Sequence, residues 1–96
     1  MEPNAIIEKY LPMLQDLQAK AATKKGICFD VYVNGENQML AQITLKDGNP
    51  DHNVAEYFHT GYSEKDMDEK VLTLYALFAE FCTVSVTGIN YHICNN

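Results

Sequence analysis

Residues 27–45 read ICFDVYVNGENQMLAQITL, and apolar side chains occupy every second position on both sides of one turn signal. A period of two is typical of a β-strand with one buried face, so we predict strands over Ile27–Val33 and Met39–Lys46. Asn34-Gly35 follows the first strand directly and is a strong hairpin signal, because both residues tolerate a positive φ. The stretch therefore predicts an antiparallel hairpin that turns one face toward a core.

A second turn and a third strand are expected after the hairpin. Asp47–Asp51 reads DGNPD, which is rich in residues that favour turns. Its oxygen-bearing side chains are similar in spacing to the opening of a calcium loop, but the glycine at the sixth position and the glutamate at the twelfth are missing. We therefore interpret Asp47–Asp51 as a turn, and Asn53–Thr60 as a third strand.

Two helices flank the strands in the sequence. Asn4–Lys25 has apolar residues at three- and four-residue steps, and Pro12 inside it predicts either a kink or two short helices. Ser63 opens the second helix as an N-cap, with Asp66 placed to reach back to it. The apolar stripe of this helix is wide enough to contact the sheet on one side and the first helix or another subunit on the other. Its members are Met67, Val71, Leu74, Tyr75, Phe78 and Phe81, and Leu72, Ala76, Leu77 and Ala79 extend it round the helix.

The last predicted element is a strand over Thr83–Ile93, because this stretch is β-branched and aromatic. Its alternation slips at Gly88, where a β-bulge would restore the phase. The expected order is thus α-β-β-β-α-β. This is an α+β fold, with an antiparallel sheet and two helices packed on one face, and we expect residues 1–96 to form a single domain.

The composition disfavours several classes of function. The net charge is −6, and all seven cations are lysines. Without arginine the chain lacks the planar guanidinium group that binds phosphate through two hydrogen bonds at once, so we expect no direct binding of nucleic acid. No apolar run approaches the roughly 20 residues that span a bilayer, so we expect no membrane partner. The first residues do not resemble a signal peptide, and three cysteines cannot all pair within one chain. We therefore expect reduced thiols and a cytoplasmic location.

No motif indicates catalysis, a cofactor or a metal. His92-x-Cys94 places two ligand-type side chains on one strand face, but neither of the tight pairs that usually hold zinc occurs. Cys82 lies at the end of the second predicted helix, without a nearby base in the sequence to activate it. We expect a protein that is not an enzyme and that carries no catalytic residue, cofactor or metal.

The candidate binding residues fall into two groups. Alternation places aromatic side chains on the sheet face opposite the predicted helices, and tyrosine there is favoured both by cross-strand pairing and by recognition of partners. Four acids crowd the start of the second helix, where they either complement the helix dipole or stand in for the phosphates of a nucleic acid. The candidates are Tyr32, Tyr57 and His59 in the first group, and Glu64, Asp66, Asp68 and Glu69 in the second. Tyr91 of the last predicted strand is a further candidate.

Three resemblances accompany this pattern. The order of elements from Asn4 to Cys82 resembles that of a double-stranded-RNA-binding domain, but residues 63–70 read SEKDMDEK, with acids where that family carries its lysines. This resemblance implies the fold and not the RNA binding. The arginine-free acidic composition, the Val33–Gly35 turn and the capped helix at Ser63 are similar to small phage and mobile-element inhibitors of host defence, anti-CRISPR proteins included. Acidic secretion chaperones have a similar size and charge.

The functional hypothesis that follows is a small acidic protein-binding module. The second resemblance implies a stoichiometric inhibitor of a host enzyme that processes nucleic acid or serves in defence. Its partner would present a basic surface, because an acidic face speeds encounter with one. Two alternatives stay open: a homo-oligomer, such as a dimer, with a structural or chaperone-like role, and a sensor that binds a small ligand between helix and sheet.

Overall fold

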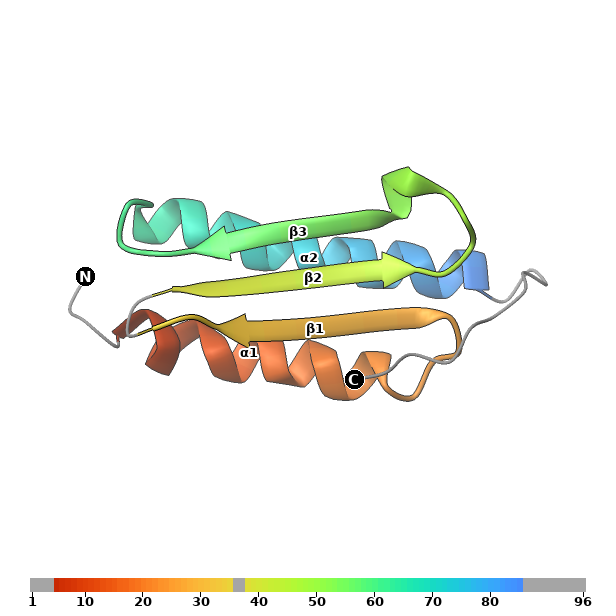
Figure 1. Cartoon of the computed structure of the whole chain (residues 1–96), viewed down its shortest axis with the longest axis horizontal. Helices are drawn as coiled ribbons and strands as arrows, with labels where there is room; N and C mark the ends of the chain where they lie inside the picture. The colour runs from red at the N-terminus through yellow and green to blue at the C-terminus, as the bar shows by residue number, and fades with distance from the viewer. Residues whose placement is uncertain (1–4, 36–37, 86–96) are drawn as a thin grey trace.

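The computed structural model describes residues 5–35 and 38–85, which form two helices and a three-stranded antiparallel sheet. Both helices cover the same face of the sheet and run in the same direction (Figure 1). The α+β class and the order α-β-β-β-α are confirmed. In chain order the elements are α1 (Ala5–Ala21), β1 (Ile27–Val33), β2 (Met39–Leu45), a 3₁₀ turn η1 (Pro50–His52), β3 (Asn53–Phe58) and α2 (Glu64–Ser85).

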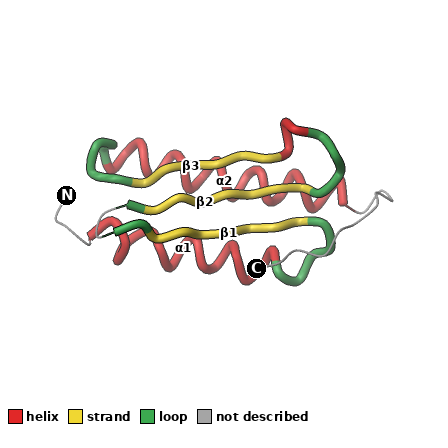
Figure 2. The backbone as a smooth tube through the Cα atoms, viewed as in Figure 1, coloured by secondary structure: helices red, strands yellow, loops and turns green. Residues whose placement is uncertain are grey.

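The sheet has the strand order β1-β2-β3, and the connecting loops gather at its two ends (Figure 2). In the register, Phe29 lies opposite Ile43, and Ile43 lies opposite Val54. Every second residue of β2 is buried, as the alternation predicted. The hairpin strands agree with the prediction at Ile27–Val33 and, apart from Lys46, at Met39–Leu45.

Helix α1 is continuous through Pro12, so the prediction of two short helices is wrong. Pro12 and Glu8 both have exposed side chains. Proline has no N–H, so the carbonyl of Glu8 lacks the hydrogen bond that residue 12 would normally donate to it. This carbonyl lies on the side of the helix that is exposed to water. The helix also ends at Ala21, before the predicted Lys25, because the chain leaves it through a turn in which the Lys24 N–H donates to the Ala21 carbonyl at 3.0 Å.

Helix α2 begins as predicted and ends later than predicted. The Asp66 N–H donates to the Ser63 hydroxyl oxygen at 3.0 Å, which is the expected N-cap. Thr83 and Val84 belong to this helix, so the strand predicted to begin at Thr83 is wrong for residues 83–85. Val84 packs against the core and the Thr83 hydroxyl donates to the Ala79 carbonyl, so local helical contacts override the strand preference of β-branched residues. The remainder of that prediction, with Gly88, Tyr91, His92 and Cys94, lies outside the described residues.

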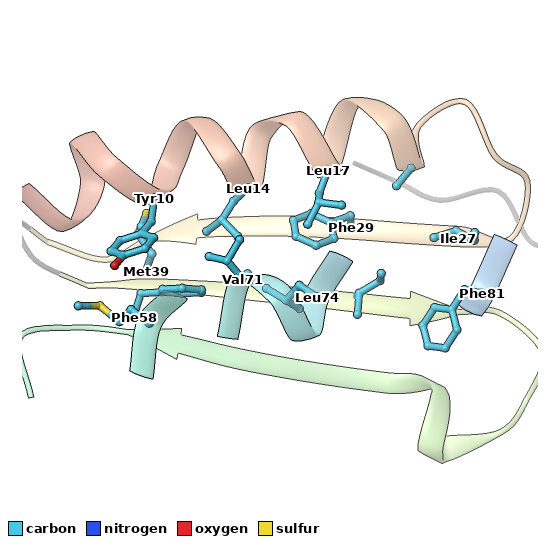
Figure 3. Close-up of a cluster of buried hydrophobic side chains, with 14 of the residues drawn as sticks. Tyr10, Leu14, Leu17, Ile27, Phe29, Met39, Phe58, Val71, Leu74 and Phe81 are labelled. Carbon is cyan, nitrogen blue, oxygen red and sulfur yellow. The ribbon is translucent and has the colours of Figure 1, made fainter. Parts of the chain in front are cut away.

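The core lies between the sheet and the two helices (Figure 3). Side chains of α1 and α2 point toward the inner faces of the strands. At one end of the core the centres of the Tyr10 and Phe58 rings lie 5.7 Å apart. Near the other end the centres of the Phe81 and His52 rings lie 5.1 Å apart. The largest fully buried side chains are Ile6, Tyr10, Leu14, Leu17, Ile27, Phe29, Met39, Ile43, Leu45, Phe58, Met67 and Phe81.

Candidate binding surface

The face of the sheet that the helices leave uncovered carries the first group of candidates. We call it the open face. Its residues alternate with the core residues along each strand. They are Cys28, Asp30 and Tyr32 of β1, Leu40, Gln42 and Thr44 of β2, and Asn53, Ala55 and Tyr57 of β3. Cross-strand pairing aligns them in three rows, which are Tyr32–Leu40–Tyr57, Asp30–Gln42–Ala55 and Cys28–Thr44–Asn53.

The first row brings two predicted candidates together. Tyr32 is 53% exposed and Tyr57 is 56% exposed, with the half-buried Leu40 between them. Each lies directly opposite Leu40 in the register, which places the two tyrosine Cα atoms roughly 10 Å apart. A tyrosine ring offers apolar area with few rotatable bonds, and tyrosine is enriched at the centre of protein interfaces. This row therefore presents a flat aromatic surface on three paired strands.

The other rows of the open face are more polar. The Gln42 side-chain N–H donates to Asn53 Oδ1 at 2.7 Å, and the Thr44 hydroxyl donates to the same oxygen at 3.2 Å. Cys28 is buried and disulfide-bonded, so the prediction of reduced thiols is wrong at this position. Asn53 and Ala55 of these rows are exposed, so the Tyr32–Leu40–Tyr57 end differs from them in its exposed aromatic side chains and not in access alone.

His59 is not part of this surface. Strand β3 ends at Phe58, before the predicted Thr60, because the chain turns at His59. The Gly61 N–H donates to His59 Nδ1 at 2.8 Å, and the imidazole packs on the Tyr62 ring at 4.3 Å. A Cβ at position 61 would lie 2.5 Å from the His59 ring, so a larger residue there would displace the imidazole from this position. His59 is therefore a structural residue, and the glycine two positions after it is the sequence signal for that role.

The acidic candidates divide into two pairs. Glu64 forms an ion pair with Lys9 of α1, and Asp68 accepts a hydrogen bond from the Tyr10 hydroxyl at 2.7 Å. Lys9 also lies 3.4 Å from Asp68. Asp66 and Glu69 are exposed. Half of the predicted acidic group thus joins α1 to α2, although the Glu64 and Asp68 side chains remain 58% and 52% exposed.

The contacts between the helices shift several pKa values. The Tyr10 hydroxyl, and after it Lys9, hold the pKa of Asp68 below its usual value, while burial and Asp68 raise the pKa of Tyr10. Glu64 raises the pKa of Lys9. Further along the helices, the Tyr75 hydroxyl donates to Asp16 at 2.9 Å, and Lys20, followed by this hydroxyl, lowers the pKa of Asp16. The two helices are thereby joined by charge-assisted hydrogen bonds along their outer side.

These shifts predict how a Tyr10→Phe variant responds to pH. A lowered Asp68 pKa contributes stability above about pH 4, which is lost as the pH falls through the folded value. A raised Tyr10 pKa contributes stability below about pH 10, which is lost as the pH rises through the folded value. We expect the variant to unfold at a lower temperature than the wild type, with the largest difference between about pH 5 and pH 9.

Thermal unfolding of both proteins from about pH 3 to about pH 11 measures the difference in unfolding temperature. The difference in unfolding temperature should become smaller at acid pH, where Asp68 is protonated, and at alkaline pH, where Tyr10 is ionised. A difference that stays constant from acid to alkali would contradict the hydrogen bond between the two side chains.

Strand β3 is an edge of the described sheet and carries an inward-facing charge. The Glu56 carboxylate meets Lys70 of α2 at 2.8 Å, and about a fifth of each side chain is exposed. The Lys70 ammonium also lies 4.3 Å from the centre of the Tyr62 ring. Inward-pointing charges on an edge strand discourage pairing with further strands. The β3 edge is therefore a poor docking site, and this leaves the open face as the better candidate.

Turn Asp47–His52 satisfies its own polar groups. One Asp47 carboxylate oxygen accepts the Asn49 N–H at 2.9 Å, and the other contacts His52 Nδ1 at 2.7 Å. These contacts, the Asn49 N–H first, hold the pKa of Asp47 below its usual value. Asn49 Oδ1 accepts the Asp51 N–H at 2.9 Å. The structure thus agrees with a turn in place of a calcium loop.

Within residues 5–35 and 38–85, no group of three histidine, cysteine or acidic side chains is placed to hold a metal ion. Every buried side-chain nitrogen and oxygen of the described residues has a hydrogen-bond partner. No described helix combines the length and the apolar character needed to cross a membrane.

Comparison of the chain with protein-family models, with curated proteins and with solved structures gave no match. A functional hypothesis therefore depends on the residues of the open face and on the charge of the chain.

Proposed function

We propose that this chain is a protein-binding module whose contact surface is centred on the Tyr32–Leu40–Tyr57 row. The observation that carries the proposal is the alignment of two half-exposed tyrosines in one cross-strand row on the helix-free face. Aromatic anchors contribute much of the binding energy in protein interfaces. Because the strands fix the backbone and few side-chain torsions remain to be ordered, binding at this row carries a small entropic cost.

The partner we propose is a host enzyme with a basic surface, which the chain inhibits by occupying that surface in a stoichiometric complex. The net charge of −6 favours such a partner and speeds encounter. Because Glu64 and Asp68 are engaged with α1, mimicry of phosphates by the acids at the start of α2 receives less support than contact through the tyrosines.

A second candidate function is self-association through the helices. Leu72 of α2 is 68% exposed, the highest value among the described large apolar side chains that lie on the surface. Its neighbours Ala76 and Ala79 are also exposed, whereas Leu77 of the predicted wide stripe packs against the core. A single leucine between small residues offers less apolar area than the tyrosine row, so we rank this candidate second.

Site-specific photo-crosslinking distinguishes the two surfaces. A benzoylphenylalanine in place of Tyr57 keeps an aromatic side chain on the open face, and the same group in place of Leu72 serves as the control on α2. Irradiation of the native host expressing each variant is expected to join position 57, and not position 72, to a second protein. Adducts from position 72 alone would contradict the proposal, and adducts between two copies through position 72 would favour self-association.

A further inference from the structure

Asp30 carries the one carboxylate among the strand residues of the open face, and no lysine occurs among them. It lies two residues before Tyr32 on the same strand, so the two Cα atoms are roughly 7 Å apart and both side chains emerge on the open face. Its side chain is half-buried, and within the described part of the chain the carboxylate has no ion pair and no hydrogen bond. Among the described residues, an acid beside an exposed aromatic ring is thus left without a partner.

The neighbour of Asp30 in the register adds a second acceptor. Gln42 lies directly opposite Asp30 and uses its side-chain N–H to donate to Asn53 at 2.7 Å. Its side-chain carbonyl oxygen has no partner in residues 5–35 and 38–85. The row next to the tyrosines therefore offers hydrogen-bond acceptors and a negative charge, and its third residue, Ala55, is small and exposed. This chemistry fits a cationic donor.

We propose that this corner of the open face, formed by Asp30, Tyr32 and Gln42, binds an arginine side chain presented by the partner protein. The inference rests on the proposed function and names the chemistry that the partner must present. A guanidinium group is planar, stacks on an aromatic face and donates several hydrogen bonds in one plane. It can therefore cover the Tyr32 ring while its edge donates to the Asp30 carboxylate. A lysine ammonium is a compact, strongly hydrated charge that matches this arrangement less well.

The complementarity of charge favours a basic segment over a second copy of this chain. The chain contains no arginine, so a second copy cannot supply the guanidinium group. It also carries a net charge of −6, so two copies repel one another. The occupant to which these observations point is a segment of another protein with an exposed arginine.

A peptide titration tests this inference without knowledge of the partner. The probe is an acetylated glycine–serine peptide with two arginines, and its controls are the same peptide with lysine or with uncharged citrulline at those positions. Nuclear magnetic resonance spectra of the ¹⁵N-labelled chain at low salt should show that the arginine peptide shifts the amide signals of Asp30, Tyr32 and Gln42. The Asp30→Asn variant should bind it about fivefold more weakly, as expected for loss of one partly exposed ion pair.

The matched control is Glu80→Gln, which removes one carboxylate from an exposed position of α2. It should leave the affinity for the arginine peptide within about twofold, since distant exposed charges contribute little. Equal weakening by Asp30→Asn and Glu80→Gln would overturn the inference, because attraction would then depend on net charge alone. Equal binding of the lysine or citrulline peptide would also overturn it, as would signals that shift with protein concentration in the absence of peptide.

The two proposals can fail separately. If position 57 crosslinks to a partner and Asp30→Asn has no effect on the peptide, the arginine site is wrong and the protein-binding surface stands. If position 57 forms no adduct and the arginine peptide still selects Asp30, the corner binds guanidinium groups but the proposed function is wrong.

Discussion

Replacement of Phe58 by alanine is expected to lower the free energy of unfolding by about 3–5 kcal/mol. Phe58 is fully buried at the end of β3, where it lies opposite Met39 in the register and packs against the Tyr10 ring. Removal of the ring loses its burial and leaves a cavity between α1 and the sheet that the surrounding backbone can only partly fill. Urea denaturation followed by circular dichroism measures the loss.

The neighbouring position provides the control. Tyr57 is the preceding residue of the same strand, but its side chain lies on the open face and is 56% exposed. Tyr57→Thr replaces one residue type that favours strands by another, the β-branched threonine, and is expected to cost less than about 1 kcal/mol. Equal costs at positions 57 and 58 would contradict the assignment of the two faces of the sheet.

The hairpin could be predicted from the sequence because its information is local. Alternation along Ile27–Val33 and Met39–Leu45 assigns each side chain to a face, and a shift of one residue would expose every core side chain. Asn34-Gly35 then fixes where the chain reverses. The Tyr32–Leu40–Tyr57 row follows from the same alternation, so the tyrosine candidates of β1 and β3 could be found without coordinates.

Features that depend on contacts between distant segments could not be predicted in this way. The bond from Tyr10 to Asp68 requires α1 and α2 to lie side by side, which neither helix encodes alone. For the same reason, the sequence could not indicate that two of the four acids at the start of α2 contact α1. Thr83 and Val84 favour strands by intrinsic preference, yet the packing of Val84 against the core continues α2 to Ser85.

Local chemistry explains why His59 and Asp30 also differ from what the sequence predicted. His59 has the alternation of a strand residue, but Gly61 allows the chain to fold back and donate to the imidazole. Asp30 was not a candidate although a signal was present, since it is the one charged residue among the alternate positions Cys28, Asp30 and Tyr32. Its importance depends on the register, which places it beside Gln42 on strands that contain no lysine.

Simultaneous replacement of Tyr32 and Tyr57 by threonine is expected to weaken partner binding by about 30-fold for each tyrosine that acts as an anchor. The two rings supply most of the exposed aromatic area of the open face, and threonine retains the preference for a strand. Because both side chains are more than half exposed, the fold should tolerate the change. Isothermal titration calorimetry with the partner identified by crosslinking measures the two affinities.

This comparison is the most direct test of the claim that the open face binds a protein partner. The matched control is Leu72→Ala, which removes an exposed apolar side chain of similar accessibility from α2. We predict that the double tyrosine variant loses at least about 30-fold in affinity while Leu72→Ala stays within about threefold of the wild type. Unchanged affinity of the tyrosine variant, together with a large loss for Leu72→Ala, would place the partner on the helices and contradict the claim.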